Sequence, residues 1–258
     1  MIKNSEIAVL VLSTKNDSYQ CFKDAIAQSW MNDFSDAGVR VFFYEGDSNE
    51  DKIVGDTIYV SCSDDICHVS QKLIGALNIL LSSLPDIKLV YRTNLSSYLE
   101  LSNFLRFVHR FRLDEQTYTG LAAHTRMMAE KFYQQRPLYY LFSRLPLGRK
   151  IRFASGSGFF MGRQICERLL GSNPDLSLID DVMVAAAVGF LRDQASIPVR
   201  LDIFPTVSKF MAISEYDRLV NESLLFHYRF KSKDRFLDSN LLKQFGSADF
   251  RRDFLIAS

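Results

Sequence analysis

The stretch "IAVLVLSTKND", residues 7–17, sets the fold class of this chain. Its first six residues, Ile7 to Leu12, are all apolar, and a polar run from Ser13 to Asp17 follows at once. An uninterrupted apolar run of this length is typical of a strand that is buried on both faces of a parallel sheet. The polar run then predicts a loop at the carboxyl end of that strand, where sheets of this kind build binding sites.

Helical and strand patterns alternate along the residues that follow. Residues 18–31 repeat a large apolar side chain every four positions, which predicts an amphipathic helix. The patterns further predict a strand at 39–47, a helix at 69–84 that stops before Pro85, and a strand at 88–91. Strands that alternate with helices indicate an α/β fold, with a mainly parallel, doubly wound sheet flanked by helices.

Length and composition favour one domain without a nucleic-acid partner. The 258 residues are 47% hydrophobic, enough to bury one sizeable core, and we expect a single domain over 1–258. The formal net charge is only +1, with acidic and basic residues nearly balanced. Nucleic-acid binding usually depends on a broad positive field, so DNA and RNA are poor candidates.

The N-terminal residues and the cysteines predict a cytoplasmic protein. The apolar run from Ile7 to Leu12 is too short for a signal peptide or a membrane span. The cysteines show no paired CxxC spacing, which favours free thiols in a reducing compartment. Cys67 and His68 follow an acidic pair, but further zinc ligands are missing, so we interpret them as ordinary side chains. The four cysteines are Cys21, Cys62, Cys67 and Cys166.

Polar residues end each of the three predicted strands. The segments are "STKND" (13–17), "YEGD" (44–47) and "RTNLSS" (92–97). Because ligands of open α/β sheets bind beyond the carboxyl ends of the strands, we expect these segments to line one crevice. The alternative is that they form three separate solvated loops.

The second half of the chain holds a glycine-containing segment and a pair of aspartates. Ser155 to Gly158 lie between a predicted apolar strand and a predicted helix, where glycine lets a ligand approach the backbone. This GSG pattern is a weak signal, and the absence of a GxxxxGK[ST] loop disfavours a phosphotransferase. Asp180 and Asp181 directly precede an alanine-rich helical run. Helix capping explains one carboxylate, and the other could be an ordinary surface charge.

Taken in order, these motifs resemble those of inverting glycosyltransferases with the GT-A fold. The most similar family is that of the β-1,3-galactosyltransferases, the β-1,3-N-acetylglucosaminyltransferases and Fringe. The resemblance implies a GT-A-type, Rossmann-like single domain, with a nucleotide-sugar-binding half over 1–115 and an acceptor-binding, catalytic half over 116–258. The residues that match the family's motifs are Ile26, Ser29, Trp30, Lys72, Leu73, Phe153 to Met161, Asp180, Asp181 and Val182.

The resemblance also implies roles for individual residues. An inverting transfer needs one carboxylate to deprotonate the acceptor hydroxyl. Asp181 matches the family's aspartate at that position, and Asp180 is the second choice. We expect the helix N-terminus to keep either aspartate ionised. The other implied contacts are Ser13, Thr14 and Asp47 with the nucleoside, Ser157 and Gly158 on the sugar and acceptor side, and His227 and Arg229 with the diphosphate.

One segment departs from the family pattern. Asn94, Leu95 and Ser96 stand where the family has three aspartates, which hold a divalent metal against the donor's diphosphate. Asparagine and serine are neutral oxygen ligands, and they bind a hard cation more weakly than carboxylates do. The role of a metal in this chain is therefore open.

Three alternatives follow from this departure. The one we favour is that Arg92, Lys72 and later basic residues neutralise the diphosphate directly, so that no cofactor is required. The second is a weak Mg²⁺ or Mn²⁺ site formed by Asn94, Ser96 and His227. The third is a protein that has lost catalysis and only binds nucleotide sugars or glycans.

Two basic segments suggest further contacts. In 226–236, cations recur at alternate positions, including Arg229 and Lys231, so an extended chain would turn them toward one side, where phosphate is a plausible target. In 130–153, aromatic and basic residues interleave, which suits a membrane surface or a platform that stacks on sugars. The alternative for 130–153 is a partly buried helical insertion.

The combined prediction is a cytoplasmic inverting glycosyltransferase. Its donor is a nucleotide sugar, uridine-linked by resemblance, and its acceptor is a glycan or a lipid-linked glycan. Such an enzyme would serve surface polysaccharide or lipopolysaccharide synthesis, with peripheral contact to the inner face of the membrane through 130–153.

Overall fold

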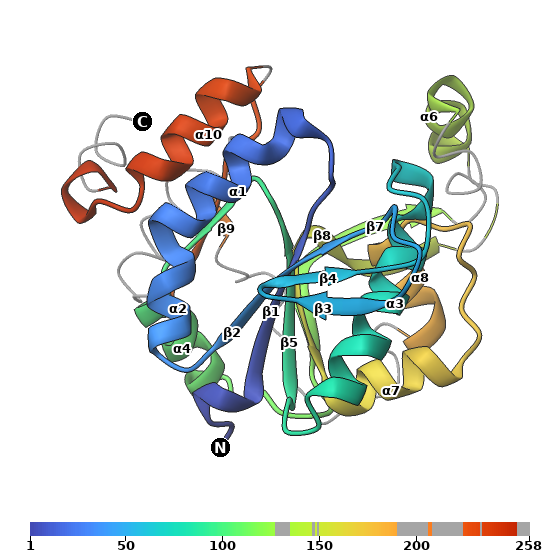
Figure 1. Cartoon of the computed structure of the whole chain (residues 1–258). Helices are drawn as coiled ribbons and strands as arrows, with labels where there is room; N and C mark the ends of the chain where they lie inside the picture. The colour runs from blue at the N-terminus through green and yellow to red at the C-terminus, as the bar shows by residue number, and fades with distance from the viewer. Residues whose placement is uncertain are drawn as a thin grey trace.

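A seven-stranded sheet lies at the centre of the computed structural model (Figure 1). Its strand order is β3-β4-β2-β1-β5-β8-β7. The central pairs β4–β2, β2–β1 and β1–β5 are parallel, whereas β3–β4, β5–β8 and β8–β7 are antiparallel. The strands are β1 (Ile7–Leu12), β2 (Arg40–Glu45), β3 (Lys52–Val54), β4 (Thr57–Tyr59), β5 (Leu89–Asn94), β7 (Tyr118–Arg126) and β8 (Lys150–Gly162). The structure describes residues 1–126, 135–145, 148, 150–189, 206–207, 224–232 and 234–251.

Helices cover both faces of this sheet, and each face has its own apolar core (Figure 1). Successive residues of β1 alternate between the two cores: Val9 packs on one face and Leu10 on the other. The helices of the first face are α1 (Gln20–Ile26), α2 (Asn32–Asp36), α4 (Leu101–Arg110) and α10 (Arg235–Gln244). Those of the second face are α3 (Val69–Ser83), α7 (Arg163–Gly171) and α8 (Asp180–Val188). A further helix, α6 (Arg136–Arg144), projects away from the sheet (Figure 1).

The predicted α/β fold class is confirmed, and the differences are local. The helix predicted at 18–31 continues through a π-helical turn, η3 (Ala27–Met31), into α2 and ends at Asp36. The strand predicted at 88–91 extends to Asn94, because β5 stays paired with β1 as far as Leu12 opposite Asn94. The extension places Arg92 and Asn94 on a rigid strand instead of in a loop.

The glycine segment that we expected between a strand and a helix lies inside β8. That strand continues to Gly162, where it pairs with β5. Against β7, however, Ala154 pairs with Ala122 while Phe159 pairs with Gly120, so four residues of β8 face a single residue of β7. The extra length forms a bulge at 155–158, and β-bulges often re-aim groups near active sites. Here the bulge turns the backbone of Gly156 toward Asp181 of α8 and Arg92 of β5.

A small second sheet connects the C-terminal part of the chain to β5. It has the order β6-β10-β9, with β6 (Ser97–Leu99) directly after β5, β9 (Thr206–Val207) and β10 (His227–Arg229). His227 is fully buried, and its Nδ1 lies 2.7 Å from Tyr91 Oη while its Nε2 lies 2.8 Å from Ser97 Oγ. This network of buried polar groups fixes the position of β10 beside the main sheet.

Gly158 offers a test of how tightly this network is packed. A Cβ atom at Gly158 would lie 2.2 Å from Tyr91 Oη and 2.8 Å from His227 Nδ1, both inside the core. We expect Gly158→Ala to lower the free energy of unfolding by about 1–3 kcal/mol, the usual cost of overpacking. Urea denaturation measures the change. Gly171→Ala is the control, because nothing lies within 4 Å of its added Cβ, and an equal loss in both variants would contradict the argument.

Candidate active site

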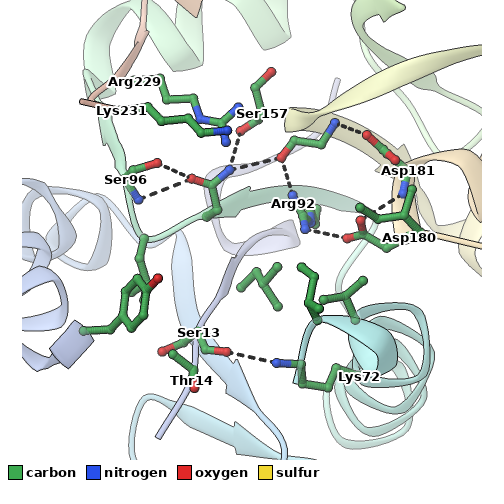
Figure 2. A pocket seen from close by; sticks show the side chains of 18 of the residues that line it. Ser13, Thr14, Lys72, Arg92, Ser96, Ser157, Asp180, Asp181, Arg229 and Lys231 are labelled. Atoms are coloured by element: carbon green, nitrogen blue, oxygen red, sulfur yellow. Dashed lines mark hydrogen bonds and ion pairs between the residues drawn. The ribbon is translucent and has the colours of Figure 1, made fainter. Parts of the chain in front are cut away.

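A cavity of about 770 Å³ opens at the carboxyl ends of β1 and β5 (Figure 2). Its size is that of a typical small-molecule site. Residues of both 1–115 and 116–258 contribute to its walls. The convergence that we expected from the polar strand ends is seen for two of the three segments, 13–17 and 92–97. Ten predicted site residues line the cavity: Ser13, Thr14, Lys72, Arg92, Asn94, Ser96, Ser157, Asp180, Asp181 and Arg229.

Arg92 is the centre of a buried network between β5, β2, β8 and α8. Its side chain is only 3% exposed. Nη2 forms an ion pair with Asp180 Oδ2 at 2.5 Å, Nε donates to Tyr44 Oη at 3.2 Å, and Nη1 donates to the carbonyl oxygen of Gly156. Burial alone would lower the pKa of Arg92, but Asp180, Tyr44 and Asp181 together outweigh burial and raise that pKa. Arg92 therefore stays a cation that compensates Asp180.

Asp181 faces the cavity from the first turn of α8. Its Oδ2 accepts a hydrogen bond from the backbone N–H of Gly156 at 2.6 Å, and its Oδ1 accepts one from Val182 N–H at 2.8 Å. The N-cap of α8 is Ile179, and neither aspartate is that cap. The bulge in β8 thus supplies the donor that orients this carboxylate, and helix capping does not explain the pair.

The electrostatics of Asp181 differ from our expectation. Burial, followed by the charge of Asp180, raises the pKa of Asp181 to about 7, despite the hydrogen bond from Gly156 and the charge of Arg92. The prediction that the helix N-terminus would simply keep this carboxylate ionised is therefore wrong, because desolvation outweighs it. A carboxylate with a pKa near neutrality can both release and accept a proton, which suits a general base.

Asp64 organises the opposite wall, and our sequence analysis missed its role. Its carboxylate accepts hydrogen bonds from Thr14 Oγ1, Lys15 N–H, Gly46 N–H and Lys72 Nζ at 2.7 to 3.0 Å. Burial acts to raise the pKa of Asp64, but these donors outweigh it and the pKa is lowered. Asp64 thereby fixes the loops after β1 and β2. The acidic pair before Cys67 was visible in the sequence, but nothing there indicated which strand ends it would join.

Lys72 has a partner in this wall. Besides its 2.7 Å ion pair with Asp64, its Nζ donates to the carbonyl oxygen of Ser13 at 3.3 Å, and the side chain is 3% exposed. The expectation that Lys72 helps to neutralise the diphosphate is therefore weakened, since Asp64 already compensates its charge. Ser13 Oγ in turn donates to the buried Glu45 at 2.8 Å.

The residues in place of the family's aspartates bind other protein groups. Asn94 donates from Nδ2 to the carbonyl oxygens of Gly156 and Ser157, at 3.1 and 3.5 Å. Its Oδ1 accepts a hydrogen bond from the Ser96 hydroxyl at 2.7 Å. Within the described part of the chain, no group of three or more His, Cys, Asp or Glu side chains could hold a metal ion. Asn94 and Ser96 thus join β5 to β8, and their polar atoms do not form the charged oxygen set that Mg²⁺ or Mn²⁺ prefers.

Three predicted site residues do not line the cavity. Asp47 lies in a separate hollow beside Lys15 and Tyr59, and its φ of 51° lies in the left-handed region. Gly158 packs against Tyr91 and His227 in the core. His227 is held by the network described above, and burial, with the nearby charge of Arg229, lowers its pKa to about 3. A neutral, enclosed imidazole is a support for β10 and not a phosphate ligand.

Basic side chains line the part of the cavity next to β10. Arg229 and Lys231 lie near Ser157 and Ser96 in Figure 2, opposite Ser13 and Thr14. The alternation predicted for 226–236 holds for these two cations, which share the cavity-facing side. Lys233 lies outside the described residues, and Arg235 forms an ion pair with Asp238 at 2.8 Å.

The fold is α/β, and its cavity lies at the carboxyl ends of parallel strands beside the buried carboxylate of Asp181. The family model described as Galactosyltransferase matches residues 23–198, which is more than half of the chain. The chain therefore belongs to the galactosyltransferase family and is a glycosyltransferase. A search of curated proteins finds no match.

The raised pKa of Asp181 predicts a pH-dependent difference between the wild type and Asp181→Asn. A carboxyl group whose pKa is higher in the folded state than its usual 3.8 contributes stability below pH 4 and loses it as pH rises through about 7. The asparagine does not titrate. The free energy of unfolding of Asp181→Asn, relative to the wild type, should rise by a few kcal/mol from pH 4 to pH 7 and then level off. Urea denaturation at a series of pH values tests this, and a constant difference would contradict it.

Proposed function

We propose that this glycosyltransferase is an inverting enzyme that transfers a sugar from a nucleotide sugar to a glycan or a lipid-linked glycan. The observation that carries the proposal is the position of Asp181, oriented by Gly156 N–H at 2.6 Å and facing a cavity that has cations on another wall. Inversion requires the attacking hydroxyl and the leaving diphosphate to lie on opposite faces of the anomeric carbon. A carboxylate on one wall of the cavity and cations on another support such a reaction.

In the proposed reaction, the acceptor hydroxyl attacks the anomeric carbon as the bond to the diphosphate oxygen breaks. The hydroxyl proton passes to a carboxylate oxygen of Asp181, and the electron pair of the broken bond leaves with the diphosphate. Asp180 forms an ion pair with Arg92 at 2.5 Å, so Asp181 is the proposed proton acceptor. Ser13 and Thr14 are the proposed nucleoside contacts, and Ser157 is the proposed contact on the sugar and acceptor side.

The donor nucleotide and the pathway are further parts of the proposal. The resemblance to β-1,3-glycosyltransferases supports a uridine-linked donor, and lipid-linked acceptors would place the enzyme in surface polysaccharide or lipopolysaccharide synthesis. Within the described residues, no helix is long and apolar enough to cross a membrane. We propose that the protein acts in the cytoplasm, at the inner face of the membrane.

Helix α6 supports the proposed contact with a lipid surface. Leu138, Tyr140 and Leu141 on this helix are 37%, 55% and 52% exposed. The sequence between Glu130 and Glu167 contains no acidic residue, but it contains seven lysines and arginines. Exposed apolar side chains in a strongly basic segment favour an anionic bilayer surface. Residues 130–134, 146–147 and 149 of the predicted contact lie outside the described residues.

Asp181→Asn tests the catalytic proposal. An asparagine of nearly the same shape cannot accept the proton, so we expect turnover to fall by at least about 100-fold, while donor binding stays within about threefold. Activity assays and calorimetry measure the two quantities. In the wild type, kcat/KM should rise with pH through about 7 as Asp181 ionises.

The control for this variant is Asp86→Asn, an exposed aspartate that precedes β5 at the far end of the sheet. Full turnover in Asp181→Asn would remove Asp181 from the mechanism. A normal rate in Asp86→Asn, with loss in Asp181→Asn, would support it.

A flotation assay with phosphatidylglycerol-containing vesicles tests the membrane contact. Replacement of both Leu138 and Leu141 by glutamine should reduce the bound fraction several-fold, because each exposed leucine would bury apolar area in the bilayer. Leu237→Gln is the control, since Leu237 is 49% exposed but lies on α10. Equal binding of all three proteins would contradict the proposed contact.

A further inference from the structure

The carboxylate of Asp64 joins three segments of the chain at one wall of the cavity. Its Oδ2 accepts hydrogen bonds from the Thr14 hydroxyl and from Lys15 N–H, both at 2.7 Å, in the loop after β1. Its Oδ1 accepts hydrogen bonds from Gly46 N–H at 3.0 Å, after β2, and from Lys72 Nζ of α3 at 2.7 Å. The side chain of Asp64 is 4% exposed, although the residue lines the cavity. One buried group thus connects the ends of β1 and β2 to helix α3.

The backbone around Asp64 also packs directly against the loop after β2. A Cβ atom at Gly46 would lie 2.7 Å from the carbonyl oxygen of Cys62 and 2.9 Å from the Cα atom of Asp64, so a larger residue would displace the loop. Asp47 N–H donates to the same Cys62 oxygen at 2.7 Å, and Asp64 N–H donates to Asp47 Oδ1 at 3.1 Å. Backbone contacts therefore fix the position of Asp64 relative to the end of β2.

The four partners of the Asp64 side chain all donate hydrogen bonds, and each carboxylate oxygen accepts two of them. An ionised carboxylate has acceptors only, whereas the amide of asparagine would turn an NH2 group toward two of these donors in either orientation. In one orientation the NH2 group would face Lys15 N–H, and in the other it would face Gly46 N–H and the ammonium group of Lys72. That buried ammonium group would also lose its compensating charge. The hydrogen bonds at this position therefore require a carboxylate.

We propose that Asp64 is a positioning residue for the donor, because it holds the ends of β1 and β2 in the arrangement that binds the nucleoside. The inference rests on the proposed function, in which Ser13 and Thr14 contact the nucleoside. Asp64 acts through these neighbours and needs no contact of its own with the reacting atoms. Thr14 lies on a different wall of the cavity from Asp181 (Figure 2). The loss of Asp64 should therefore weaken donor binding and leave the proposed proton acceptor in place.

Calorimetric titration in the presence of Mn²⁺ tests the proposal. The probes are the diphosphates and the monophosphates of uridine, thymidine, guanosine and cytidine. Asp64→Asn should weaken binding of the matching diphosphate at least about tenfold, since it leaves a buried N–H donor without an acceptor. Asp64→Glu keeps the charge that compensates Lys72 but displaces both oxygens by one methylene group, and should weaken binding about three- to tenfold. The matching monophosphate should lose affinity by the same factor, because the two loops contact the nucleoside.

Asp51→Asn is the matched control, because Asp51 does not line the cavity and accepts hydrogen bonds from Ser61 N–H and the Ser61 hydroxyl on Oδ1 alone. Asparagine retains that oxygen, so the affinity of this variant should stay within about twofold of the wild type. Misfolded protein lowers the stoichiometry of binding and not the affinity, which separates a loss of folded protein from a loss of positioning. Asp64→Glu, which keeps the buried charge balanced, decides the question if Asp64→Asn does not fold.

Three results would overturn this inference and leave the proposed function standing. One is wild-type affinity in folded Asp64→Asn or in Asp64→Glu. Another is an equal loss in Asp51→Asn. The third is a loss for the diphosphate alone, which would mean that Asp64 acts only through the charge of Lys72. If none of the four diphosphates binds to the wild type, both proposals fail.

Discussion

The buried guanidinium of Arg92 is the interaction on which the rest of the site depends. It links β5 to β2 through Tyr44, to β8 through Gly156 and to α8 through Asp180. A cation in this position is favourable only because Asp180 faces it at 2.5 Å, and the removal of either partner would leave an uncompensated buried charge. Because Arg92 contacts both Gly156 and Asp180, it also holds the β8 bulge against α8. The bulge in turn presents Gly156 N–H to Asp181, so the geometry of the proposed base follows from the Arg92 ion pair.

The two neighbouring aspartates acquire different properties from this one cation. Asp180 has the guanidinium as a direct partner, whereas Asp181 has two backbone N–H groups and a negatively charged neighbour. The pKa of Asp181 is therefore raised by burial and by Asp180. Adjacent carboxylates in unlike environments are a common basis for dividing structural and proton-transfer roles. The sequence motif alone, two aspartates at the start of a helix, cannot distinguish the two.

The three neighbouring parallel strands β2, β1 and β5 could be predicted from the sequence, because each is an apolar run with a polar end, whereas β3, β4 and β7 were not predicted. Ile7 to Leu12 is one such run, and its place in the sheet follows from that pattern alone. The convergence of 13–17 with 92–97 followed from the rule for parallel sheets. Asp47, Asp64 and His227 could not be placed in this way. Each is a polar residue at or near a strand end, and only the loop conformation or the tertiary contacts determine whether it faces the cavity, a separate hollow or the core.

Neutral residues in place of the family's aspartates let the end of β5 form hydrogen bonds with the β8 bulge. Carboxylates at the positions of Asn94 and Ser96 would repel the carbonyl oxygens of Gly156 and Ser157, with which the Asn94 amide now forms hydrogen bonds. A neutral amide can join β5 to the bulge without a metal ion to screen negative charge. The cavity then contains Arg92, Lys72 and Arg235 beside carboxylates that compensate them. In the proposed reaction, positive charge beside β10 and a proton acceptor on α8 lie on different walls of one cavity, which is the polarity that an inverting displacement requires.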